Sequence, residues 1–149
     1  MANCTLFWDM HGARDNLAAF LADPNCILLA ADVAGKPVGQ VTGHILRRWD
    51  SKPPMLFLFS IDVLEAHRQK GVARKMIQLF HRIGKEAGCG GSFVFTNASN
   101  TPAMALYQSL GGKRTNPDDV MFEWEQAGGV TCRRGRRRAC VPPPARFSR

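Results

Sequence analysis

Residues 61–80, IDVLEAHRQKGVARKMIQLF, contain the junction that decides the fold, because an apolar segment changes there into a helix. The preceding segment, MLFLFSIDVL at 55–64, is apolar almost throughout and predicts a central strand. Beyond Gly71, apolar residues recur at helical spacing as far as about Ala87, and Gly88 is the expected stop. A helix N-terminus offers unpaired N–H groups and the positive end of a dipole, so this junction suggests an anion site.

The other segments supply the remaining elements of an α/β domain. The sequence predicts a helix at 14–22, strands at 26–33, 37–46 and 92–96, a helix that opens at Thr101-Pro102 and ends at Gly111, and a closing strand at 120–125. An opening hairpin followed by strand, helix, strand, helix and strand predicts a mixed sheet with helices on both faces.

The positive charge of the chain is concentrated at its C-terminal end. The formal net charge is +8, yet residues 126–149 hold seven arginines and no acidic residue. Without that segment, thirteen basic residues stand against twelve acidic ones, so residues 1–125 are nearly neutral. The segment 126–149 is rich in glycine, arginine and proline and shows no periodicity. We predict one folded domain at 1–125 and a disordered tail at 126–149.

Several classes of protein and site do not fit this sequence. The five cysteines include no CxxC pair, which predicts reduced thiols, and Cys26 and Cys89 are expected in the core. No basic-then-apolar leader and no apolar run of membrane-spanning length is present, which predicts a soluble, cytoplasmic protein without membrane contact. The histidines lack partners at ligand spacing, so no metal is expected. Neither G-x-x-x-x-G-K-[ST] nor a G-x-G-x-x-G after a strand occurs, which excludes two common phosphate loops.

A second motif follows the strand predicted at 92–96. The segment NASNTPAMALYQSLGG at 97–112 contains N-x-x-A-x-x-L-Y, which begins at Asn100, and it closes on a glycine pair. Together with the R-x-x-G-x-A motif that begins at Arg68, in this order and at this separation, it resembles the GNAT superfamily of acetyl-CoA-dependent N-acetyltransferases over about residues 17–125. The sequence differs from the family pattern at Ala73 and Gly112, where a glycine and an aromatic residue are commoner, and in its short N-terminal part.

The resemblance implies a splayed mixed sheet that binds acetyl-CoA at the opening between the strands at 55–64 and 92–96. It implies direct transfer of acetyl to a primary amine, with main-chain N–H groups near Val63 polarising the thioester carbonyl and Tyr107 protonating the CoA thiolate. The residues implied to bind the cofactor are Ile61, Val63, Arg68, Gln69, Lys70, Gly71, Val72, Ala73, Asn100, Ala103 and Tyr107.

The predicted catalytic residues, Tyr107 and Asp62, each have a purely structural interpretation as well. A lone tyrosine can be a partly buried helix residue, and Asn100 can cap the helix while it also touches the cofactor. Asp62 and Ser60 are expected on the face opposite Ile61, where Asp62 would accept the proton of an amine whose unperturbed pKa is about 10.4. The alternative for Asp62 is a loop or solvent contact.

The acceptor is predicted from a finer resemblance. The block FSIDVLEAHRQKGVA at 59–73 and the pairing of LGG with DDVMF resemble the aminoglycoside 3-N-acetyltransferase type I branch, which implies acetylation of an aminoglycoside 3-amino group and antibiotic resistance. The predicted substrate residues, which would form a negative cleft for a cationic amine, are Ser60, Asp62, Asp118, Asp119 and Glu123. In the alternative interpretation, Asp118 and Asp119 form a turn and Glu123 lies on a solvated face.

Other functions remain open on the sequence alone. The acceptor would then be another small amine or a peptide N-terminus, or a non-catalytic GNAT fold would bind CoA without turnover. The arginine-rich tail is the feature that favours non-specific nucleic-acid binding, but no aromatic residue is interleaved with its arginine run. GNAT enzymes often form homodimers, although no segment here identifies an interface.

Overall fold

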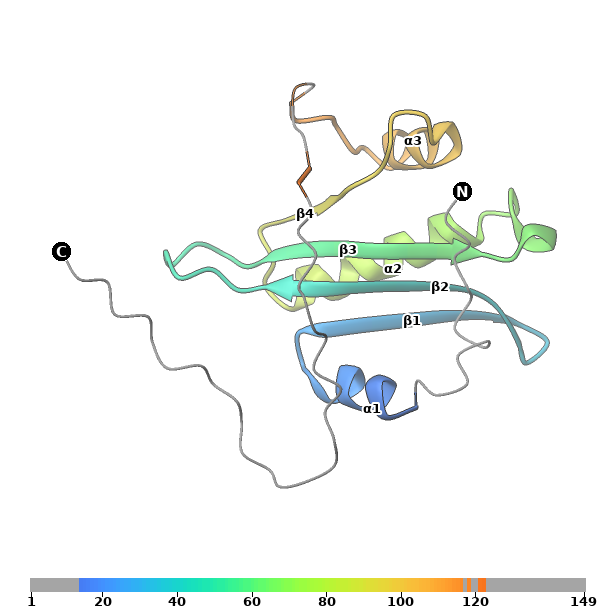
Figure 1. Cartoon of the computed structure of the whole chain (residues 1–149), viewed down its shortest axis with the longest axis horizontal. Coiled ribbons are helices and arrows are strands. Elements are labelled where there is room, and N and C mark those ends of the chain that lie inside the picture. Colours follow the sequence, from blue (N-terminus) through green and yellow to red (C-terminus); the bar gives the residue numbers. More distant parts are fainter. Residues whose placement is uncertain (1–13, 117, 119–120, 123–149) are drawn as a thin grey trace. The chain divides into compact units, whose positions relative to one another are not determined.

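The computed structural model describes residues 14–116, 118 and 121–122 of the chain (Figure 1). The chain divides between Lys113 and Arg114 into two units, and all the helices and strands described here belong to the first. The elements are α1 (Arg14–Ala22), β1 (Cys26–Val33), β2 (Lys36–Leu46), β3 (Met55–Val63), a 3-10 turn η2 (Glu65–His67), α2 (Val72–Glu86), β4 (Gly91–Val94) and α3 (Thr101–Ser109). Only Met121 and Phe122 of the predicted closing strand are described, and the predicted tail at 126–149 lies outside the described residues.

The four strands form one mixed sheet in the order β1-β2-β3-β4, as Figure 1 shows. The β1–β2 and β2–β3 pairs are antiparallel, and β4 joins β3 in parallel. A parallel pair needs a crossover connection, and α2 provides it between β3 and β4. The mixed sheet predicted from the sequence is therefore confirmed.

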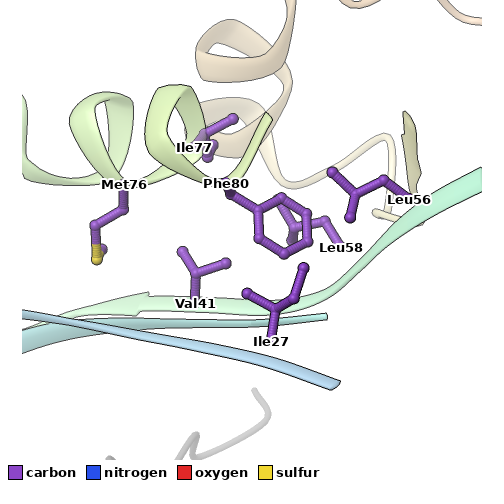
Figure 2. Close-up of a cluster of buried hydrophobic side chains, with 7 residues drawn as sticks. All are labelled: Ile27, Val41, Leu56, Leu58, Met76, Ile77 and Phe80. Carbon is purple, nitrogen blue, oxygen red and sulfur yellow. The ribbon is translucent and has the colours of Figure 1, made fainter. Parts of the chain in front are cut away.

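Helix α2 covers one face of this sheet and forms the core with it. Its apolar side chains recur at helical spacing, so they share the side that faces the strands. Figure 2 shows the buried cluster, which consists of Met76, Ile77 and Phe80 from α2 and Ile27, Val41, Leu56 and Leu58 from the strands. Each buried side chain of this size contributes about 1.5–3 kcal/mol relative to exposure. This burial holds the N-terminus of α2 at a fixed position beside the end of β3.

Helix α1 lies on the other face of the sheet. The ring of Phe20 meets the ring of His44 edge-on, with 5.5 Å between the centroids. Because side chains alternate along a strand, His44 points away from the face on which its neighbour Val41 is buried, three positions earlier. The prediction of helices on both faces is confirmed.

Gly43 of β2 is required by the packing of α2. A Cβ atom built on Gly43 would lie 2.7 Å from Phe80 Cε2 and would also meet the carbonyl oxygen of Phe57, so neither neighbour leaves room for it. We expect Gly43→Ala to lower the free energy of unfolding by about 1–3 kcal/mol, because overpacking a dense core costs that much. Urea unfolding would measure the loss. Gly91→Ala is the matched control, since a Cβ there approaches only the flexible end of Met55, at 3.3 Å, and an equal loss in both variants would contradict this account.

Candidate active site

Strands β3 and β4 pair over only part of their length. Their parallel register runs from Met55 opposite Gly91 to Leu58 opposite Val94, where β4 ends, whereas β3 continues to Val63. The sequence predicted the fourth strand to extend two residues further, to 96. Just after Leu58 the register between β2 and β3 shifts, so that Thr42 faces Ser60 and Phe59 is an extra residue. Within the described residues, 59–63 thus have a paired edge toward β2 and no strand partner on the β4 side.

The backbone of that open edge presents Ile61 and Val63. The N–H of Leu64 donates to the carbonyl oxygen of Val38 at 2.9 Å, so the backbone groups of Leu64 face β2. Successive residues of a strand direct these groups to opposite sides, and Val63 and Ile61 therefore direct theirs away from β2. The Nε–H of Arg68 donates to the carbonyl oxygen of Val63 at 3.0 Å, which agrees with this orientation. Of the residues predicted to bind the cofactor, Ile61 and Val63 thus lie on the edge that faces away from β2.

The loop after β3 brings backbone N–H groups to the start of α2. Gln69 and Gly71 both adopt left-handed backbone conformations, with φ of 58° and 78°. Gly71 is the N-cap of α2 and makes no side-chain capping hydrogen bond, and the first turn contains no acidic residue. The N–H of Lys75 is already committed, because it donates to the carbonyl oxygen of Gly71 at 3.1 Å. The N–H groups before it are those that a helix leaves unpaired, which is the arrangement that binds phosphate.

The side chains of this loop are largely exposed. Arg68, Gln69 and Lys70 are exposed, and Val72 and Ala73 are half-buried. The ammonium group of Lys70 donates to the carbonyl oxygen of Ala66 at 2.8 Å, which folds the side chain back along the loop. A Cβ atom on Gly71 would meet nothing within 4 Å, so the space in front of this N-cap is open.

Helix α3 carries the second predicted motif. The side-chain oxygen of Asn100 accepts a hydrogen bond from the N–H of Ala103 at 3.3 Å, so the capping role expected for Asn100 is present. Tyr107 is half-buried and contacts the core cluster. Burial raises the pKa of Tyr107 above its ordinary value, and the negative charge of Asp62 raises it further. The charge of Asp62, on β3, thus acts on Tyr107, on α3.

A contact that the sequence did not indicate ties α3 to α2. The guanidinium group of Arg74 donates to the Ser109 hydroxyl at 2.8 Å and to the Ser109 carbonyl oxygen at 3.5 Å. Arg74 lies in the first turn of α2, and Ser109 ends α3. The link thus connects the N-terminal turn of α2 with the helix that carries Tyr107. No local pattern identifies such a pair, because its members are far apart in the chain.

The face opposite α2 bears a row of polar side chains beside the open edge. Ile61 and Val63 contact the core cluster, so Ser60 and Asp62 point to the opposite face, as predicted. The hydroxyl oxygens of Ser60 and Thr42 lie 2.6 Å apart. Gln40 faces Asp62 across the strand pair and is buried, with 8% of its surface exposed. Thr42 and Gln40 were missed as site residues, because the alternation of β2 only indicated a half-buried strand.

The predicted acidic cleft falls largely outside the residues that the structure describes. Asp118 is exposed and belongs to the unit that follows Lys113, and its N–H donates a hydrogen bond to Asn116 Oδ1 at 3.0 Å. This local contact is typical of the turn that the alternative interpretation proposed. Asp119 and Glu123 lie outside the described residues. Their contact with substrate, and that of Asp118, stays a prediction.

Metal ligands, reactive thiols and membrane-spanning helices are three further features that the described residues could provide. No group of three or more His, Cys, Asp or Glu side chains in this part of the chain could hold a metal ion. Cys26 and Cys89 are half-buried free thiols, and burial is the main cause that raises the pKa of each. A raised pKa favours the thiol over the nucleophilic thiolate. Among the described helices, none is both long and apolar enough to cross a lipid bilayer.

The influence of Asp62 on Tyr107 can be measured directly, because Tyr107 is the only tyrosine in the chain. Asp62→Asn removes a negative charge that disfavours the phenolate, so the pKa of Tyr107 should fall. It should remain above its ordinary value, because burial, the larger cause, is unchanged. Ultraviolet titration of the phenolate would record both effects. Asp32→Asn, on β1, is the control variant and should leave the titration of Tyr107 unchanged. An unchanged titration in Asp62→Asn would show that the charge of Asp62 does not act on Tyr107.

The comparison with known proteins decides the family. Residues 2–112 match the family model described as Acetyltransferase (GNAT) family. The chain belongs to this GNAT acetyltransferase family. Over 101 residues it is 33% identical to the aminoglycoside N(6')-acetyltransferase type 1 of Salmonella typhimurium, an alignment that covers 68% of this chain and 66%, just under two thirds, of that enzyme. The mycothiol acetyltransferase of Pseudarthrobacter chlorophenolicus is 28% identical over 67% of this chain and 31% of its own length.

Solved structures show the same GNAT fold. The structure of AAC(6')-Iy in complex with the bisubstrate analog CoA-S-monomethyl-acetylneamine has a TM-score of 0.67 and 27% identity, and the match covers 80% of this chain and 84% of that one. An aminoglycoside acetyltransferase from an uncultured soil metagenomic sample, in complex with trehalose, has a TM-score of 0.68, with 81% of each chain covered. Its 21% identity supports the fold alone.

The finer assignment to the 3-N type I branch is not supported by these GNAT relatives. The Salmonella enzyme and AAC(6')-Iy are both named for the 6' position. The 3-N assignment relied on the block at 59–73, and the place of this block in the fold explains why it was a poor guide to the acceptor. Much of the block at 59–73 forms the open edge of β3 and the loop before α2, which are predicted to bind the donor. Residues that bind the donor do not determine which amino group of the acceptor reacts.

Proposed function

We propose that this GNAT chain transfers acetyl from acetyl-CoA to an amino group of an aminoglycoside, and that the 6'-amino group is its position of attack. One observation carries the proposal, namely the convergence of three features at one end of the sheet. These are the uncapped N-terminus of α2 at Gly71, the open edge of β3 at Ile61 and Val63, and the electrostatic influence of Asp62 on Tyr107.

The donor side of the site follows from the first two features. The N–H groups at the start of α2 would hold the pyrophosphate of acetyl-CoA, with positive charge from Arg68 and Lys70 nearby. The backbone of Ile61 and the N–H of Val63 face away from β2 and would bind the pantetheine amides as an added strand, while the Val63 carbonyl is already bonded to Arg68. The N–H groups near Val63 would also stabilise the oxyanion that develops when an amine attacks the thioester carbonyl.

The acceptor side follows from the pair of side chains. An alkyl amine is mostly protonated at neutral pH, with a pKa of about 10.4, and must lose its proton before attack. Asp62 would accept that proton, directly or through water. Tyr107 would then donate its phenolic proton to the departing thiolate, since its raised pKa keeps the phenol protonated beyond neutral pH. Protonation of Asp62 removes the charge that raises the pKa of Tyr107, so the first proton transfer makes the second easier.

The choice of acceptor rests on the relatives. The Salmonella enzyme is named as an aminoglycoside N(6')-acetyltransferase, and AAC(6')-Iy was solved with an acetylneamine analog. The metagenomic aminoglycoside acetyltransferase has also been solved in complex with sisomicin. These names support an aminoglycoside for this chain, and they favour attack by the 6'-amino group over the 3-amino group expected from the sequence.

The test is to locate the acetyl group in the product. Purified protein would be incubated with isotopically labelled acetyl-CoA and neamine or sisomicin, and the product would be analysed by NMR. We expect label on the 6'-nitrogen. Label on the 3-nitrogen would leave the acetyltransferase intact and overturn the regiochemistry. No labelled aminoglycoside, with acetylation of a peptide or a simple diamine in parallel reactions, would overturn the acceptor class.

A further inference from the structure

Five aromatic rings form one connected surface on the face of the sheet opposite α2. We call it the aromatic surface, and it consists of His44, Phe57, Phe59, Phe93 and Phe95. Phe57 and Phe93 stack with centroids 5.0 Å apart and planes inclined by 17°. Phe59 meets Phe57 edge-on at 6.0 Å, and Phe95 meets Phe93 edge-on at 5.7 Å. The geometry is that of mutually supporting rings, which hold one another in place.

Two rings of this surface are turned toward solvent. Phe59 is 67% exposed and Phe95 is 66% exposed. Single exposed apolar side chains are ordinary, but two that belong to one connected cluster form a patch of the kind that binds a partner. Phe59 is the extra residue of β3, and Phe95 follows the last residue of β4. The patch therefore begins where the two strands stop pairing.

The aromatic surface is continuous with the proposed acceptor site. Phe57 pairs with His44 across the strands, and Ser60 pairs with Thr42 on the same face. Asp62 follows two residues after Ser60 on that face. An amine that reacts beside Asp62 would thus extend along β3 toward Phe59.

The charges of the surrounding strands suit a cationic occupant. Asp62 is the only charged residue of β3, and residues 91–112 contain no charged residue at all. No lysine or arginine of these segments would repel an ammonium group. The face of an aromatic ring carries negative electrostatic potential and attracts cations within about 6 Å of its centroid. A face of four phenylalanines and His44, continuous with one carboxylate, matches a molecule with several ammonium groups.

We propose that the aromatic surface binds a non-reacting, ammonium-bearing ring of the acceptor, so that Phe59 and Phe95 determine a preference for polycationic amines. This inference deepens the proposed function and rests on it. The reacting amine lies beside Asp62, while the second cationic ring of the same molecule lies against Phe59 and Phe95.

The test measures acceptor binding separately from turnover. Neamine would be titrated calorimetrically into CoA-saturated wild type, Phe59→Ala, Phe59→Leu and Phe95→Ala, and acetyl transfer would be followed in parallel. Each substitution should weaken neamine binding about tenfold, with CoA affinity unchanged. Phe59→Leu keeps apolar bulk without a π face and should be as weak as Phe59→Ala. Trp49→Ala is the matched control, because Trp49 is 97% exposed in the loop between β2 and β3, far along β3 from Asp62. This variant should bind neamine as tightly as wild type does.

Each contrary result has a distinct meaning. Wild-type affinity in Phe59→Ala or in Phe59→Leu would overturn the inference, since the ring face would then contribute nothing specific. Dissociation of an oligomer by Phe59→Ala, seen by light scattering with unchanged neamine affinity, would assign the aromatic surface to contacts between copies of this chain. The expected loss of affinity with no acetyl transfer by wild type would support the aromatic surface and refute the proposed function instead.

Discussion

Gly71→Glu should abolish the binding of acetyl-CoA while the protein stays folded. The φ of 78° at Gly71 is a left-handed conformation that disfavours a side chain, and the space in front of its Cα is open. A glutamate there would place a negative charge where the pyrophosphate is proposed to bind, and like charges brought together cost several kcal/mol. We expect the Kd for acetyl-CoA to rise by roughly 100-fold or more. Calorimetric titration would measure it.

A second variant separates charge from backbone strain. Gly71→Asn introduces a shorter polar side chain without charge, and asparagine tolerates the left-handed region better than most residues. It should therefore bind acetyl-CoA much more tightly than Gly71→Glu does. If Gly71→Glu bound the cofactor as well as wild type, the loop before α2 would not be the pyrophosphate site.

Tyr107→Phe should lower kcat by about 100- to 1,000-fold, within the range that a positioned general acid contributes. The variant keeps the ring that packs against the core, so its stability and its Kd for acetyl-CoA should change little. The loss should appear in kcat and in kcat/KM alike, because the proton is transferred only as the thiolate departs. Steady-state kinetics would show it.

The control for this variant is another residue of the same helix. Gln108 is exposed on α3 and next to Tyr107, so Gln108→Ala tests whether disturbance of the helix alone slows the reaction. Its kcat should match that of wild type. Unchanged turnover in Tyr107→Phe would remove Tyr107 from the mechanism and leave the half-buried helix residue that the alternative interpretation described.

The elements of the fold could be predicted because their signals are local. The apolar run at 55–64 and the helical spacing after Gly71 correctly predicted β3 and α2, and Asn100 and Pro102 marked the start of α3. The predicted end of β4, at residue 96, was wrong, because the strand ends at Val94. Phe93, Val94 and Phe95 are all apolar, so the sequence marks no end point there, whereas the pairing of β4 with β3 ends at Val94 and Leu58.

The candidate site was predictable on its donor side and much less so on its acceptor side. The predicted donor residues belong to two short segments, so their order and spacing indicated them. Gln40 and Arg74 are brought to the site by pairing with Asp62 and Ser109, which are distant in the chain. The aromatic surface likewise combines rings from three strands and the residue after β4, and no single segment shows that they meet. The choice of acceptor depends on such contacts between distant segments, so it could not be predicted from the sequence alone.

The most direct test of acetyl transfer is thiol release from acetyl-CoA. Purified protein would be mixed with acetyl-CoA, with and without sisomicin, neamine, a simple polyamine or a short peptide, and free CoA would be measured over time. We predict release that requires an amine and is fastest with the aminoglycosides. No amine-dependent release, in protein that binds acetyl-CoA normally, would contradict the account and indicate a GNAT fold that holds the cofactor without transferring its acetyl group.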